Sequence, residues 1–173
     1  PLAEGERRRR SRIQLGAVRR MLPDIDSFHW ITVGVSCLIV AIAVVLHYEV
    51  LSRLHRFLDT THMGERPRIL TLIFVLLFTH IAEIWLFGLG ALYLLQTPEL
   101  GGIANMQHIT LFDTVYLSAT TYTTLGYGDL TPTGNIRFLY GMESLTGLVL
   151  VTWSASLTFI ELQRQWQGMR RKP

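Results

Sequence analysis

Long apolar segments separated by short polar ones dominate this chain. Three of them cover residues 28–47, 69–95 and 138–160. Each is near or above the ~20 residues that an α-helix needs to cross the hydrocarbon core of a bilayer. The pattern predicts an all-α membrane protein with three transmembrane helices per subunit.

The polar stretch after the first apolar segment has a helical pattern of its own. Residues 48–68 begin with apolar residues on one helical face, while Arg53, Arg56 and Asp59 fall elsewhere. The apolar residues are Val50, Leu51, Leu54, Phe57 and Leu58. This pattern predicts an amphipathic linker at the membrane interface, with its basic residues near anionic lipid head groups.

Composition leaves little room for other functions. Of 173 residues, 49% are hydrophobic and 17% are charged, against about one quarter charged in soluble domains. We therefore expect no encoded ligand-sensing domain. The sequence shows no Gly-rich nucleotide fingerprint, no metal-ligand cysteine spacing and no nucleophile-base constellation, so we expect neither an enzyme nor a cofactor. The arginine-rich run lacks interleaved aromatics, which argues against nucleic acid as a partner.

The segment between the second and third apolar stretches carries the most specific signal. Thr110 and Asp113 have the spacing of a capping box, which predicts a short helix over residues 111–123. The run that follows places a tyrosine between Gly126 and Gly128. Glycine accepts the positive φ angles that other residues resist. The run is therefore interpreted as a segment that exposes its backbone carbonyl groups, which serve as the functional groups.

The run Thr124-Leu125-Gly126-Tyr127-Gly128-Asp129 resembles the signature of the tetrameric potassium-channel pore-loop family. Leu125 stands where the commonest version has Val. The resemblance implies that the carbonyls of Thr124, Leu125, Gly126 and Tyr127, with the Thr124 hydroxyl, replace the hydration shell of K⁺. It also implies a homotetramer and a passive, K⁺-selective pore that needs no cofactor beyond K⁺ itself.

The resemblance covers residues 69–163. It implies an outer helix over 69–95, a re-entrant pore helix over 111–123, an extended filter over 124–128 and an inner helix over 137–163. Residues 28–47 are an additional helix before this pore unit, an arrangement similar to that of small prokaryotic potassium channels.

The surroundings of the filter depart from the family pattern. Tyr116 and Leu117 occupy positions where many relatives have a tryptophan pair that braces the filter tyrosine. Thr120 stands where some relatives have an acid that pairs with the residue matching Asp129, so that pairing cannot form here. The Tyr127 hydroxyl then needs Tyr116, Thr120 or a neighbouring subunit as its partner, and Thr123 completes the set of filter supports.

The inner helix carries one glycine at a position of interest. Gly147 lies about where the family bends this helix to open its gate. A glycine permits both bending and close helix packing, so the two roles remain open.

Two carboxylates lie at membrane depth, where charged groups are costly and usually have a partner. Glu83 has His80 three residues earlier on the same helical face. This spacing predicts a hydrogen-bonded pair, with proton sensing as a hypothesis. Glu143 is expected behind the filter, where it receives a hydroxyl from Thr120, Thr121 or Tyr122.

Charge predicts the topology. None of the 16 Lys and Arg residues lies between Gln96 and Ile136. By the positive-inside rule the filter mouth then faces outward and the basic tail, 164–173, is cytoplasmic, in a cell membrane. If residues 28–47 span, segment 1–27 lies outside, although it carries seven arginines. Four explanations are open: the first segment lies in the membrane interface, the arginine run is a non-native extension, the topology of the pore overrides the charge bias, or a signal peptide is cleaved. We favour the non-native extension and the overriding topology of the pore.

Three rival functions follow from the same sequence. A weakly selective cation channel would typically have a disrupted Gly-Tyr-Gly core. A potassium transporter of a related family joins four pore repeats in one chain. A membrane scaffold would have a filter that does not conduct.

Overall fold

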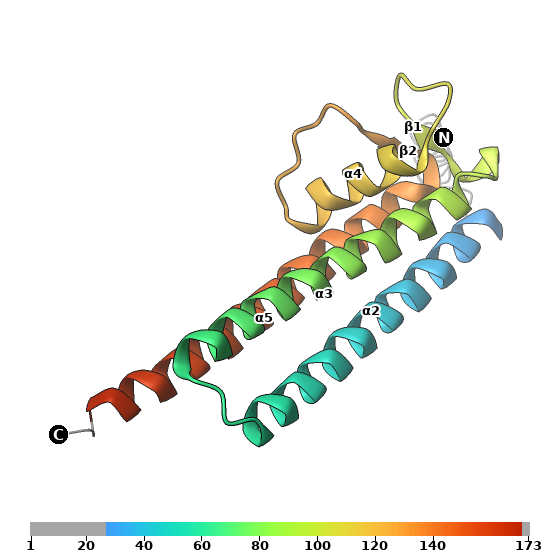
Figure 1. The fold of residues 1–173 in the computed structure, drawn as a ribbon. Coiled ribbons are helices and arrows are strands. Elements are labelled where there is room, and N and C mark those ends of the chain that lie inside the picture. Colours follow the sequence, from blue (N-terminus) through green and yellow to red (C-terminus); the bar gives the residue numbers. More distant parts are fainter. Residues whose placement is uncertain (1–26, 171–173) are drawn as a thin grey trace, which may run out of the picture.

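The computed structural model describes residues 27–170, so the arginine-rich segment up to residue 26 and the last three residues of the basic tail lie outside the described part. Its elements (Figure 1) are, in chain order, helices α2 (Ser27–Thr60) and α3 (Glu65–Leu94), 3₁₀ helix η1 (Pro98–Leu100), strand β1 (Gly102–Ile103), helix α4 (Leu111–Tyr122), strand β2 (Pro132–Thr133), 3₁₀ helix η2 (Gly134–Ile136) and helix α5 (Arg137–Arg170).

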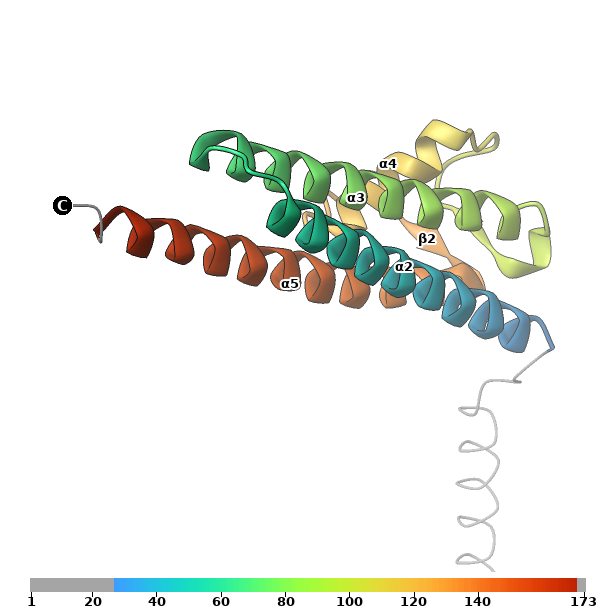
Figure 2. The same ribbon diagram turned by 60° about the horizontal axis from the view of Figure 1, so that its bottom comes forward.

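The three long helices α2, α3 and α5 lie side by side, and each contacts the other two (Figure 2). Within residues 27–170, these three are long and apolar enough to cross a membrane. The prediction of an all-α membrane protein with three transmembrane helices is therefore confirmed.

Helix α2 is longer than the sequence pattern predicted. It continues without a break through the residues expected to form a separate interfacial linker, so the predicted helix end near residue 47 is wrong. Its buried residues form one stripe along the whole helix: Thr32, Ser36, Ile39, Ala43, His47, Leu51, Leu54 and Leu58. The apolar face seen in residues 48–58 is the continuation of this stripe, and no Gly or Pro interrupts it before Gly64.

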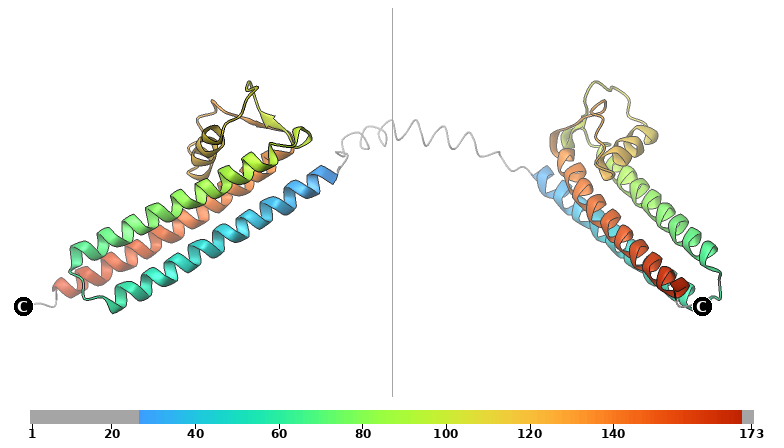
Figure 3. Two further views of the ribbon diagram at one scale, coloured as in Figure 1. Left: turned by 45° about the vertical axis from the view of Figure 1, so that its right-hand side comes forward. Right: turned by 90° about the vertical axis from the view of Figure 1, so that its left-hand side faces the viewer.

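The two ends of the bundle have separate apolar cores. Leu51, Leu54 and Leu58 of α2 pack with Leu72 and Leu76 of α3 at the end that holds the α2–α3 turn (Figure 3). At the opposite end, Phe28 packs against a cluster that includes Leu100, Ile103 and Leu139. Helix α2 therefore runs the full length of the bundle and begins at the end that carries η1 and η2. An interfacial placement of residues 28–47 does not fit this packing.

An ion-pair cluster joins the three long helices near the α2–α3 turn. Arg68 of α3 donates to Glu161 of α5, to the Leu58 carbonyl at 2.7 Å and to Asp59 at 3.4 Å. The Arg68 side chain is 21% exposed and that of Glu161 is 10% exposed. The guanidinium thus links all three helices at this end.

Helix α4 enters the bundle obliquely from its other end (Figure 1). The capping box predicted from Thr110 and Asp113 is present, with the Asp113 N–H donating to the Thr110 hydroxyl and the Thr110 N–H donating to the carboxylate. The helix ends at Tyr122, whose hydroxyl donates to Glu83 in the middle of α3. It therefore descends from the surface to the middle of the bundle, as a re-entrant helix does.

A small antiparallel sheet holds the loops on either side of α4 together. Gly102 of β1 pairs with Thr133 of β2, and Ile103 pairs with Pro132. The segment after α3 is thereby fixed to the segment that follows the loop after α4, which anchors both ends of the re-entrant region.

Candidate functional site

The loop after α4 leaves helical geometry at once. The Thr124 N–H donates to the Thr121 carbonyl at 2.9 Å, and the Gly126 N–H donates to the Thr120 carbonyl at 3.0 Å. Thr124, Gly126 and Gly128 have φ angles of 58°, 53° and 77°. Glycine adopts such angles readily, whereas Thr124 adopts one at a cost. Gly126 and Gly128 thus stand where the backbone requires them.

This loop is uncovered in a single chain. Residues 123–129 are all exposed, including the apolar Leu125 at 56% and the aromatic Tyr127 at 68%. Removal of apolar side chains such as these from water lowers the free energy of the system. The loop is therefore a surface that the chain does not bury by itself.

The filter supports expected from the sequence make different contacts. The Tyr116 hydroxyl donates to Asp129 at 2.8 Å, and this hydrogen bond to a carboxylate raises the pKa of Tyr116. Thr120 donates to the Leu117 carbonyl, and Thr123 donates to the Ala119 carbonyl. Asp129 is therefore held by Tyr116, a pairing that the sequence analysis did not assign, and the two threonine hydroxyls bond within α4.

Glu143 lies where it was expected but has a different donor. It is fully buried on α5 and accepts a hydrogen bond from the Ser118 hydroxyl at 3.3 Å. The expected donors Thr120, Thr121 and Tyr122 are not its partners: Thr120 donates to the Leu117 carbonyl and Tyr122 donates to Glu83. Its second oxygen has no hydrogen-bond partner among the described residues.

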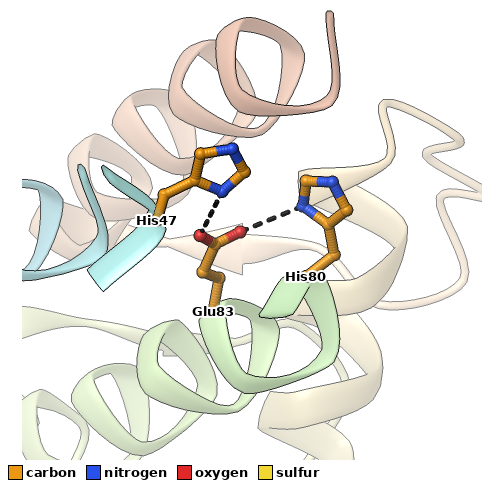
Figure 4. Close-up of side chains that lie close together, drawn as sticks. All are labelled: His47, His80 and Glu83. Carbon is orange, nitrogen blue, oxygen red and sulfur yellow. Dashed lines mark hydrogen bonds and ion pairs between the residues drawn. The ribbon is translucent and has the colours of Figure 1, made fainter. Parts of the chain in front are cut away.

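The pair formed by His80 and Glu83 is part of a larger buried cluster (Figure 4). His80 Nδ1 lies 3.0 Å from Glu83 Oε2, as the helical spacing predicted. His47 Nδ1 of α2 lies 2.8 Å from the other oxygen, Oε1. The side chains of His47 and Glu83 are fully buried, and that of His80 is 16% exposed.

His47 was not among the residues predicted for this site, because it stands at the end of the first apolar segment. Its position four residues after Ala43 and four before Leu51 puts it in the buried stripe of α2. This helical spacing was the feature of the sequence from which burial of His47 could have been predicted. A histidine in such a stripe requires a polar partner from another helix, which here is Glu83.

Two further residues complete this cluster. The Tyr122 hydroxyl lies 2.9 Å from His80 Nδ1 and donates to Glu83 Oε2. The Ser154 hydroxyl of α5 lies 3.0 Å from His80 Nε2 and 3.3 Å from His47 Nε2. The cluster therefore joins α2, α3, α4 and α5 at one point, and its Tyr122 stands two residues before Thr124.

Gly147 packs against the end of the pore helix. A Cβ atom at this position would meet the Tyr122 carbonyl oxygen, and its carbonyl carbon at 2.9 Å. Helix α5 runs unbroken past it from Arg137 to Arg170. Of the two roles considered for Gly147, the structure shows the packing contact.

Three long apolar helices, with a short re-entrant helix packed on α3 and α5 and an irregular loop after it, define the class of a multi-pass membrane protein with a pore loop. The model of the ion channel family matches residues 69–164, which is more than half of the chain. The chain belongs to this ion channel family and forms its pore-bearing subunit. No curated protein and no solved structure matches the chain significantly.

Proposed function

We propose that this subunit forms a K⁺-selective channel in which K⁺ crosses the filter without its hydration shell. The carbonyls of Thr124, Leu125, Gly126 and Tyr127 provide the ligands, with the Thr124 hydroxyl. The observation that carries the proposal is the non-helical backbone at 124–128, with positive φ at both glycines and directly after a re-entrant helix. Carbonyl rings of this kind replace the water around K⁺.

The assembly that completes the filter is a homotetramer. One chain supplies one filter segment, and a ring of carbonyls around an ion needs four. The exposed Leu125 and Tyr127 support this, because neighbouring copies would bury them. The Tyr127 hydroxyl then finds its partner in an adjacent subunit.

Helix α4 contributes electrostatically to the proposed site. Its carboxyl end, at Tyr122, lies at the middle of the bundle, and the carboxyl end of a helix carries partial negative charge. Four such ends would converge below the filter and stabilise a cation there. This arrangement favours cations over anions independently of the carbonyl ring.

The proposed orientation places the filter mouth outside the cell membrane and the basic tail in the cytoplasm. It rests on the absence of Lys and Arg between Gln96 and Ile136. Because α2 begins at the filter end of the bundle, Ser27 then lies on the outer side. Basic residues at the opposite end, such as Arg53 and Arg56, are available to anionic lipid head groups.

Ion flux through the purified protein in liposomes tests the selectivity. The proposal predicts K⁺ flux well above Na⁺ flux, and loss of this preference in Gly126→Ala, because an added Cβ is strained at φ 53°. Gly34→Ala is the matched control, since a Cβ there meets no neighbouring atom.

The outcomes separate the alternatives. Equal K⁺ and Na⁺ flux would indicate a weakly selective cation channel. Absence of flux from correctly assembled protein would indicate a scaffold. Either result would contradict the proposal, as would a Gly126→Ala variant that retains full selectivity.

A further inference from the structure

The cluster of His47, His80 and Glu83 has the donor set of a divalent transition-metal site. Two imidazoles and a carboxylate are ligands that Zn²⁺ commonly takes in proteins. One ligand atom from each residue lies within 4.8 Å of the others. The three residues come from two packed helices, so their positions are set by the bundle and not by a flexible loop.

The separation of the two rings suits a shared ion. Both rings turn Nδ1 toward Glu83 (Figure 4), and their centroids are 5.4 Å apart. Two imidazoles bound to one tetrahedral Zn²⁺ at about 2.0–2.1 Å have ring centroids roughly 5.2 Å apart. The distance of 2.8 Å between His47 Nδ1 and Glu83 Oε1 needs to widen only to about 3.3 Å for such an ion to enter.

Hydrogen-bond counting at Ser154 gives an independent argument. If each neutral imidazole donates Nδ1–H to Glu83, both Nε2 atoms are acceptors that face Ser154. The serine hydroxyl has one proton and serves only one of them. With a metal ion on both Nδ1 atoms, each Nε2 carries its proton instead. The Ser154 oxygen, which has two lone pairs, then accepts from both.

The remaining neighbours fit the same arrangement. Metal-bound histidines usually donate their second N–H to an oxygen, which Ser154 provides here. The Tyr122 hydroxyl donates to Glu83 Oε2 and orients the carboxylate, leaving Oε1 for the ion. Trp153 packs on His47 with a centroid distance of 5.4 Å and shields the site on the α5 side. The partly exposed His80 gives access.

We propose that His47, His80 and Glu83 bind one divalent transition-metal ion per chain, of the zinc class, with Ser154 and Tyr122 as positioning residues. The ion clamps α2 to α3 and, through Tyr122, to the end of the pore helix. The site does not depend on the proposed K⁺ selectivity, because its ligands lie outside the filter.

The test is metal retention by the full-length protein, purified in detergent. After loading with Zn²⁺ and desalting, elemental analysis is expected to find about one ion per chain. Co²⁺ in its place is expected to give the intense visible absorption of a tetrahedral site. His47→Gln and Glu83→Gln remove a ligand and are expected to abolish both signals. His108→Gln, at an exposed residue, is the control and retains them.

A second variant keeps the proposal testable if the ligand variants fail to assemble. Ser154→Ala leaves all three ligands in place and is expected to weaken Zn²⁺ binding by about 10- to 100-fold. Wild-type protein that retains no Zn²⁺ and gives no tetrahedral Co²⁺ spectrum overturns the proposal, and the cluster then holds protons only. Equal retention by wild type and the assembled His47→Gln variant overturns it as well.

Discussion

At the residue scale, short side-chain contacts fix the start of α4 and hold the loop that follows it. Thr110 and Asp113 close its amino end through a reciprocal capping box. After the helix, Tyr116 donates to Asp129 across the 123–129 loop. The first contact was readable from the Thr-x-x-Asp spacing. The second depends on how the loop folds back over α4, which local spacing does not encode.

The capping box makes the helix start sensitive to acid. The Thr110 hydroxyl and N–H both donate to the Asp113 carboxylate, which lowers the pKa of Asp113. A lowered pKa in the folded state means that the carboxylate stabilises the fold above the ordinary Asp pKa, and that this contribution is lost as pH falls through the lowered value. Thermal unfolding over a pH series is expected to show this loss in wild type. In Asp113→Asn the unfolding temperature is expected to stay constant over the same pH range. Identical pH profiles for wild type and Asp113→Asn would contradict the account.

The hydroxyl of Tyr116 is expected to stabilise the conducting filter. Tyr116→Phe removes its hydrogen bond to Asp129 and leaves the ring in place. Single-channel recordings are expected to show shorter open periods, with K⁺ preference retained. Tyr93→Phe, at an exposed tyrosine on α3, is the control. Unchanged open times in Tyr116→Phe would show that Asp129 is held by other groups.

At the element scale, small residues let α4 lie close against its neighbours. A Cβ at Gly147 would meet the Tyr122 carbonyl, and a Cβ at Gly88 would lie 2.9 Å from the Val115 Cα. Both obstacles are backbone atoms, which cannot rotate away. These two glycines therefore set how deeply the re-entrant helix enters between α3 and α5.

Gly147→Ala is accordingly expected to destabilise the protein by about 1–3 kcal/mol, the usual cost of overpacking. The measurement is thermal unfolding of the detergent-solubilised protein. Gly34→Ala meets open space and should leave the midpoint unchanged or raise it, because alanine favours a helix. A Gly147→Ala variant as stable as Gly34→Ala would show that α4 has room to shift, and would return the hinge role to consideration.

The sequence predicted the helices correctly where local spacing and capping residues allowed a single interpretation. The limits of α4 and the capping of its start followed from local chemistry. The end of α2 did not, because an amphipathic stretch that continues a buried stripe has the same pattern as a separate interfacial helix. Helical spacing predicted His80 as a partner of Glu83 but not His47, which only the packing of α2 on α3 brings to it. Ser154 likewise reaches the two histidines only through the packing of α5.

At the scale of the whole molecule, residues 27–170 form a bundle of three long helices with a re-entrant helix and its loop at one end. Helix α2 packs on α3 and α5. Arg68 hydrogen-bonds α3 to both of the other helices at the end of the bundle opposite the 123–129 loop. The loop after α4 is left uncovered at residues 123–129. An apolar loop that the chain does not cover, at the end of a re-entrant helix, fits a subunit whose function needs further copies.

The reversal potential across a planar bilayer tests the central claim, K⁺ selectivity at the 124–128 filter. With a tenfold K⁺ gradient and an opposite Na⁺ gradient, the account predicts a value near the K⁺ equilibrium potential, about 59 mV in magnitude. Tyr127→Val is expected to move it toward zero while the protein still inserts and assembles. A wild-type value near zero, or a Tyr127→Val value equal to that of wild type, would contradict the account.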